Sequence, residues 1–147
     1  MAGGGRATSF LTRFAVAMMA GLMLGILGLA VLPAFLPDLD PLVRWGFFLW
    51  YPTVAGVIAL AAPGGPGEAG RIVLPWWLRA VVIGAWMNFV AILLAPEVMR
   101  AFMRAAFGED GLLASPFWFV AEGAGAGLVI GYLVMRFAAE GRGIADD

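Results

Sequence analysis

The chain has 147 residues, of which 63% are hydrophobic, and its mean hydropathy is +0.94. Only 13% of the residues are charged, whereas a soluble domain carries about 25%. A soluble core of this size cannot enclose so much apolar surface, and the same hydrophobicity excludes a disordered chain. We therefore expect an integral membrane protein.

Several residue types that carry chemistry are absent. The chain has no His and no Cys, and all nine basic residues are Arg. These absences exclude disulfides, ligation of metals or haem by His or Cys, and catalysis by His or Cys. The net charge of −1 gives no electrostatic footprint for nucleic acid. We predict a non-enzymatic protein with no catalytic residues, no metal, no cofactor and no nucleic-acid partner.

Four stretches are long enough to cross a bilayer, because a spanning helix needs about 20 mostly apolar residues. They comprise residues 14–35, 41–62, 75–95 and 116–137. None alternates between apolar and polar residues as a strand of a membrane β-barrel does. The predicted fold is all-α, a polytopic bundle of four transmembrane helices over residues 14–138. We expect flexible tails at 1–13 and 139–147. The first stretch is too long for the apolar region of a signal peptide and is predicted to be a true span.

Proline and glycine mark the breaks between these spans. Pro41 and Pro75 suit the first position of a helix, where a missing N–H has no consequence. Residues 63–70 form a polar, glycine-rich loop. Ser115 and Pro116 are typical of an N-cap followed by a first helical residue.

The segment 96–107 is too short to cross the membrane. Glu97, Arg100 and Arg104 are spaced to share one face of a helix. Three apolar residues fall on another face: Val98, Phe102 and Ala105. This pattern favours a short interfacial helix between the third and fourth spans. The alternative is an extension of the third helix beyond the bilayer.

Arginine and tryptophan suggest an orientation. With four spans both ends lie on one side, and that side carries six Arg against three on the other. The positive-inside rule then places both termini in the cytoplasm. Because the Arg-only, Ala/Gly-rich usage suggests a bacterium, we expect the bacterial inner membrane. Trp50 and Trp86 do not fit the interfacial belts, so we expect them to pack or to line a cavity.

Most charged residues flank the predicted spans, whereas Glu122 lies inside the fourth one. It lies six residues past Pro116, about 9 Å into its helix at about 1.5 Å per residue. Asn88 falls at a similar depth on the third span, Tyr51 is somewhat deeper, and Arg44 lies near the outer end of the second span. A polar cluster of these residues in the outer half of the bundle is therefore predicted as a candidate substrate- or proton-binding site.

Two interpretations of Glu122 are open. Ionisable groups inside a span are candidates for substrate or proton handling. They also join helices structurally, and in that case Glu122 pairs with Arg44, with Asn88 or with a partner subunit. Arg79, one turn inside its helix, is explained by snorkelling to the interface.

Small residues predict close helix packing. Gly123, Gly127 and Gly131 form one row, and Gly21 and Gly25 form another on the first span. Rows of this kind let two helix backbones approach each other closely.

Pro52 lies in the middle of the second span and should kink or break that helix. The carbonyl that it leaves without a donor could bind an ion or water, or packing could cover it.

Two functions follow from these patterns. The first is a small accessory subunit that packs into a larger membrane assembly, with the lipid bilayer and other membrane proteins or further copies of itself as partners. The second is a small proton-coupled transporter or channel that uses Glu122. A lipid-modifying enzyme is least favoured, because it would have to work without His, Cys or Lys.

Overall fold

The computed structural model describes residues 4–61, 74–109 and 112–143, and the predicted loop at 63–70 lies outside these ranges. Within them the chain is all-helical. The helices are α1 (Gly4–Phe35), α2 (Pro41–Leu60), α3 (Trp76–Leu94), α4 (Pro96–Phe107), the short 3-10 turn η1 (Leu112–Ala114) and α5 (Trp118–Gly143).

Four of the described helices, α1, α2, α3 and α5, are long and apolar enough to cross a membrane, which confirms the predicted four-helix membrane bundle. Helices α2 and α3 end within two residues of the expected bounds, and the larger differences lie at the two chain-terminal ends and at the start of α5. Helix α1 begins at Gly4 and α5 ends at Gly143, so helix extends into both predicted tails. No proline interrupts either extension, and adding a residue to an existing helix gains a hydrogen bond. Helix α5 begins at Trp118, after a tight turn in which Trp118 N–H donates to the Ser115 carbonyl.

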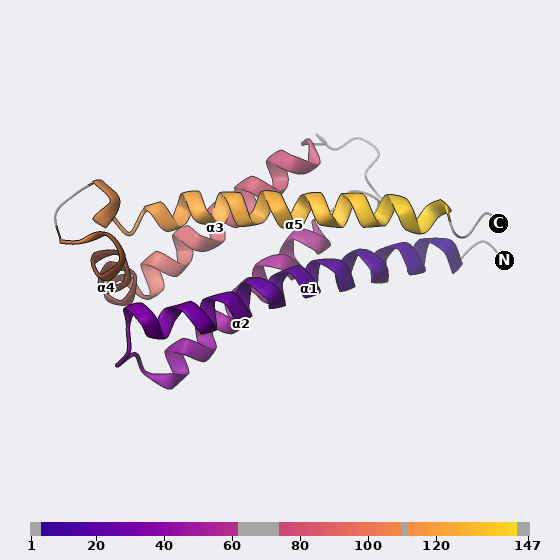
Figure 1. Cartoon of the computed structure of the whole chain (residues 1–147). Coiled ribbons are helices and arrows are strands. Elements are labelled where there is room, and N and C mark those ends of the chain that lie inside the picture. Colours follow the sequence, from indigo (N-terminus) through magenta and orange to yellow (C-terminus); the bar gives the residue numbers. More distant parts are fainter. Residues whose placement is uncertain (1–3, 62–73, 110–111, 144–147) are drawn as a thin grey trace.

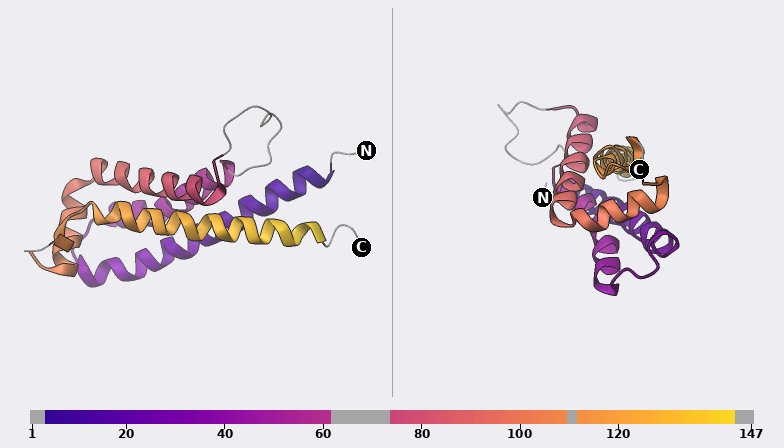
Figure 2. Two further views of the ribbon diagram at one scale, coloured as in Figure 1. Left: turned by 90° about the horizontal axis from the view of Figure 1, so that it is seen from above. Right: turned by 90° about the vertical axis from the view of Figure 1, so that its left-hand side faces the viewer.

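The two ends of the chain lie at the same end of the bundle, as an even number of spans requires (Figure 1). Helix α4 lies at the opposite end, and the right-hand view of Figure 2 shows it running across the ends of the long helices. Helix α3 packs mainly against α5, α1 packs mainly against α2, and a contact between α1 and α5 joins the two pairs. Helix α2 makes only small contacts with α3 and with α5.

Small residues bring α3 and α5 together. A Cβ added to Gly127 would meet the Ala80 carbonyl, and one added to Gly84 would meet the Gly123 carbonyl. Gly131 faces the side chains of Ala80 and Trp76. The predicted row on α5 is therefore a contact within the chain, and it is matched on α3 by Ala80 and by Gly84.

The second row packs against the proline of α2. A Cβ on Gly21 would meet the Tyr51 carbonyl and Pro52, and one on Gly25 would meet the Phe48 carbonyl. Proline has no N–H to donate to the carbonyl four residues earlier, and for Pro52 that carbonyl belongs to Phe48. The freed carbonyl thus lies against Gly25 of α1. Helix α2 continues through Pro52 without a break.

Helix α4 is a separate helix, since the chain turns at Ala95 (φ −134°, ψ 56°) before it begins. Its exposed face carries Glu97, Arg100 and Arg104, as predicted. The packed face differs from the predicted one. Met99 and Met103 are buried, whereas Ala105 is exposed. Helix α4 packs against the ends of α1 and α5. The side of α4 that is covered is the side of the two methionines, and Ala105 lies outside it.

Aromatic rings and one arginine fix the helix ends. The Phe102 ring lies 5.3 Å from that of Phe35 and 5.5 Å from that of Phe119, so α4 contacts both α1 and α5.

At the other end of the bundle Arg79 donates to the Ala61 carbonyl at 2.9 Å and to the Leu74 carbonyl. A cation at the last carbonyls of α2 is favourable. Arg79 thus caps a neighbouring helix, a role that the expected snorkelling did not include.

Two glycines of α5 make a matched pair for testing this packing. Gly127→Ala should lower the free energy of unfolding by about 1–3 kcal/mol, because its Cβ would overlap the Ala80 backbone. Gly125→Ala should be neutral or stabilising, because nothing lies within 4 Å of the added Cβ and alanine favours helix. Thermal unfolding in detergent micelles measures both. Equal destabilisation by the two variants would contradict the α3–α5 contact described here.

Candidate functional site

A hydrogen-bonded network joins α2, α3 and α5 in the half of the bundle near α4. The Asn88 amide nitrogen donates to Glu122 Oε2 at 2.6 Å and to the Phe119 carbonyl at 2.9 Å. The Asn88 amide oxygen accepts the Trp50 indole N–H at 3.0 Å. The Tyr51 hydroxyl donates to Glu122 Oε1 at 2.7 Å. We call Trp50, Tyr51, Asn88 and Glu122 the polar network.

Asn88 lies at the centre of the polar network and is buried, with 4% of its surface exposed. Its position depends on Gly123, because a Cβ at that residue would meet Asn88 Cβ and Cγ. The glycine row therefore does more than bring two helices together. It also leaves room for the amide to lie against α5, within reach of both the Phe119 carbonyl and Glu122.

Glu122 sits at the edge of the exposed face of α5. Each of its carboxyl oxygens accepts one hydrogen bond, and both donors belong to neutral side chains, Tyr51 and Asn88. A carboxylate removed from water is costly unless hydrogen bonds replace its hydration. The polar network supplies such bonds without supplying a positive charge.

Three of the four residues predicted to cluster are thus brought together, and Arg44 is not. Its guanidinium donates to the Pro37 carbonyl in the turn between α1 and α2. The physical reason is local, because Arg44 lies in the first turn of α2 and that carbonyl is within its reach. The predicted participation of Arg44 in the cluster is therefore wrong.

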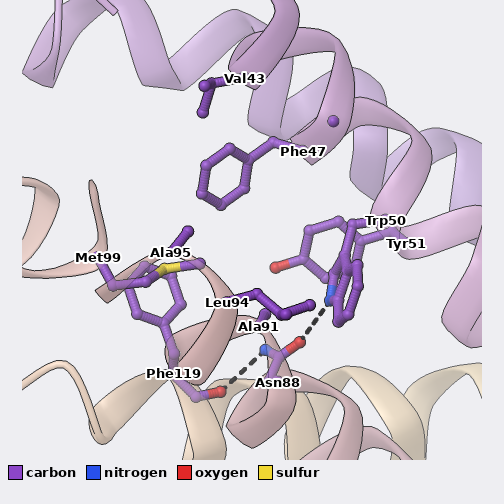
Figure 3. Close-up of a pocket in the computed structure, with 11 residues that line it drawn as sticks. Val43, Phe47, Trp50, Tyr51, Asn88, Ala91, Leu94, Ala95, Met99 and Phe119 are labelled. Carbon is purple, nitrogen blue, oxygen red and sulfur yellow. Dashed lines mark hydrogen bonds between the residues drawn. The ribbon is translucent and has the colours of Figure 1, made fainter. Parts of the chain in front are cut away.

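A cavity of about 210 Å³ adjoins the polar network (Figure 3). It lies between α2 and α3 and is also lined by Met99 of α4 and by Phe119 of α5. Eleven residues line it: Val43, Gly46, Phe47, Trp50, Tyr51, Asn88, Ala91, Leu94, Ala95, Met99 and Phe119. Its wall is apolar except where Trp50, Tyr51 and Asn88 reach it.

The residue that the predicted cluster lacked is Trp50. Its sequence position gave a partial signal, because a tryptophan away from the interfacial belts is expected to pack or to line a cavity. Trp50 does line the cavity, and its N–H also binds Asn88. Trp86, the other tryptophan outside the belts, is 62% exposed and contacts the Phe89 ring.

The chemistry available at this site is hydrogen bonding and proton exchange at one carboxyl group. In the part of the chain that the structure describes, no group of three or more acidic side chains gathers where it could hold a metal ion. Tyr51 and Asn88 line the cavity and also donate to Glu122, so they connect the cavity wall to this carboxyl group.

Removing single members of the polar network should destabilise the bundle unequally. Tyr51→Phe deletes one bond and should cost about 1 kcal/mol. Asn88→Ala deletes three bonds and should cost about 2–3 kcal/mol, because it leaves Trp50 N–H and Glu122 Oε2 without these partners. Thr53→Val is the control, since Thr53 Oγ1 binds only the Leu49 carbonyl of its own helix among its described contacts. Unfolding in micelles measures all three, and a Thr53→Val loss as large as that of Asn88→Ala would contradict the network.

No family model, curated protein or solved structure matches the chain. The membrane bundle, the polar network and the cavity are therefore the observations on which a function can be based.

Proposed function

We propose that this chain is a non-enzymatic membrane carrier that binds a small amphipathic molecule in the cavity between α2 and α3. The observation that carries the proposal is the position of the cavity beside the polar network. Tyr51 and Asn88 form part of the cavity wall and also donate to Glu122. A ligand in the cavity would therefore lie one side chain away from an intramembrane carboxyl group, where its binding can affect proton binding and the reverse.

The packing of α2 supports this proposal. Helix α2 packs mainly against α1 and makes only small direct contacts with α3 and α5, so few direct interactions oppose a movement of α2 relative to α3. Among the described residues, the polar network and the bond from Arg79 to the Ala61 carbonyl are polar links between α2 and α3. Breaking and reforming a few hydrogen bonds is a small enough change for a transport cycle to reverse.

A second candidate, an accessory subunit of a membrane assembly, is favoured by the outward face of α5. Ala121, Glu122 and Gly125 are exposed there, and a Cβ on Gly125 would meet nothing within 4 Å. A partner helix could approach this face closely and cover the carboxyl group. The glycine rows no longer favour this candidate, because both are occupied by contacts within the chain.

We further propose that the chain lies in a bacterial inner membrane with both termini in the cytoplasm. Six of the nine Arg lie on the terminal side of the four spans, which is the bias of cytoplasmic segments. In this orientation α4 and the cavity lie in the outer half of the membrane.

Water access to the cavity distinguishes the two candidates. The chain has no Cys, so one introduced thiol is the single labelling site. A membrane-impermeant maleimide should label Ala91→Cys in the cavity wall and should label Leu93→Cys much more slowly. Leu93 is the matched control, because it is 61% exposed, lies nearer the end of α3 and does not line the cavity.

A carrier must open its binding site to water, whereas we expect Leu93, which is exposed on a membrane-spanning helix, to face lipid. Labelling is measured in membrane vesicles, with total thiol determined after denaturation. If Ala91→Cys stays unlabelled, or reacts no faster than Leu93→Cys, the carrier proposal is contradicted and the accessory subunit is favoured.

A further inference from the structure

The chemistry of the cavity indicates which class of ligand it would hold, and this inference rests on the proposed carrier function. We propose that it selects a lipophilic ammonium compound, that is, a small aromatic or aliphatic body that carries a positively charged amine. Neutral hydrocarbons of the same shape and carboxylic acids should bind less well. Four properties of the cavity wall support the proposal.

The first property is that the donors on the wall are already engaged. Trp50 Nε1–H points to Asn88 Oδ1, and the Asn88 amide nitrogen donates to Phe119 and Glu122. The Tyr51 hydroxyl donates to Glu122. What these groups still offer are lone pairs, on the Tyr51 hydroxyl oxygen and on Asn88 Oδ1. A ligand that meets them must therefore bring hydrogen-bond donors of its own.

The second property is charge. Glu122 accepts from Tyr51 and from Asn88, and both of these residues are neutral. In a medium of low dielectric constant, a carboxylate paired only with neutral donors attracts a cation much more strongly than it would in water. A cationic group in the cavity would lie next to the two side chains that hold this carboxylate.

The third property is the aromatic wall. Phe47, Trp50, Tyr51 and Phe119 all line the cavity, and Figure 3 shows the rings of Phe47 and Phe119 across it from Asn88 and Trp50. Aromatic faces attract ammonium groups, by about 0.5 kcal/mol where exposed and about 2 kcal/mol where desolvated. The same faces accommodate an apolar ligand body.

The fourth property is size. The cavity measures about 210 Å³, compared with about 150 Å³ for an engineered cavity that holds benzene. A ligand with one ring and a short chain therefore fits, whereas pockets for drug-sized molecules begin at about 300 Å³.

An anionic ligand is disfavoured for a related reason. Arg44 is the one basic residue of α2, and it follows Val43, which lines the cavity. The Arg44 Nε is buried without a hydrogen-bond partner. However, Arg44 does not line the cavity, and its terminal nitrogen donates to the Pro37 carbonyl. The wall thus presents lone pairs and aromatic faces to a ligand, with Glu122 directly behind them.

The experiment compares four probes that share one phenylalkyl body: 2-phenylethylammonium, 2-phenylethanol, propylbenzene and 3-phenylpropionate. Binding to the full chain in nanodiscs of zwitterionic lipid is measured by equilibrium dialysis, as the excess over protein-free nanodiscs. We expect 2-phenylethylammonium to bind about tenfold more tightly than propylbenzene. 2-Phenylethanol should bind with intermediate affinity, and 3-phenylpropionate should not bind detectably.

Three variants locate the selectivity. Glu122→Gln should reduce the preference for ammonium over propylbenzene to about twofold or less, whereas Glu97→Gln, an exposed carboxylate of α4, should leave it unchanged. Ala91→Phe should block every probe by filling the cavity, and Gly46→Leu is a second filling variant at a wall residue with open space beside its Cα.

The outcomes separate the ligand class from the cavity itself. If propylbenzene or 3-phenylpropionate binds as tightly as 2-phenylethylammonium, and a filling variant still blocks binding, the ligand class is wrong while the cavity remains a binding site. If no probe binding is sensitive to either filling variant, the proposed binding function fails as well. Should Glu122→Gln not fold, the order of the four probes on the unaltered chain still decides the ligand class.

Discussion

The polar connection between α2, α3 and α5 depends on one buried amide. Asn88 uses both of its amide hydrogens and its oxygen, and in doing so it connects α3 to α2 and to α5. Helix α2 packs mainly against α1 and makes little other contact with α3 and α5, so the amide is a main direct connection between them at this depth. The amide reaches these partners only because Gly123 has no side chain. Helix packing and polar chemistry are thus two consequences of the same short segment of α5, Glu122–Gly123.

The membrane explains why such an arrangement is stable. Between helices surrounded by lipid there is no hydrophobic driving force, so close packing and interhelical hydrogen bonds hold the bundle together. The glycine rows supply close packing in the pairs α3–α5 and α1–α2, and the α1–α5 contact together with the polar network links the two pairs. The weakly packed region between α2 and α3 leaves the cavity beside the polar network. The proposed carrier would use this combination. The extensive contacts would keep the pairs α3–α5 and α1–α2 intact, while the small contact between α2 and α3 changes.

The sequence predicts the spans well and the site in part. Apolar length determines where a helix can cross the bilayer, so four spans follow from composition and proline positions alone. Depth along each helix places Tyr51, Asn88 and Glu122 at related levels, and the structure brings them together. Depth cannot show which way a side chain turns. Arg44 therefore joins a nearby backbone carbonyl rather than the cluster, and Trp50 joins the cluster unforeseen.

A single sequence likewise does not show which helices pack against each other. A glycine row predicts close approach but does not identify the other helix, and both rows proved to serve contacts within the chain. Gly84 forms no row in the sequence because it is the single glycine of α3, and its role depends on its position against Gly123. The stripe of α4 that is buried, centred on Met99 and Met103, depends in the same way on what lies beneath that helix.

The most direct measurement is a double-mutant cycle between Trp50 and Asn88. Trp50→Phe keeps an aromatic ring and removes the N–H, Asn88→Ala removes its acceptor, and unfolding free energies of the single and double variants are compared in micelles. If Asn88 joins α2 to α3, the double variant should lose about 1 kcal/mol less than the sum of the single losses, as expected for two groups in direct contact. Losses that simply add would mean that the two side chains do not interact, and the central role given to Asn88 would be contradicted.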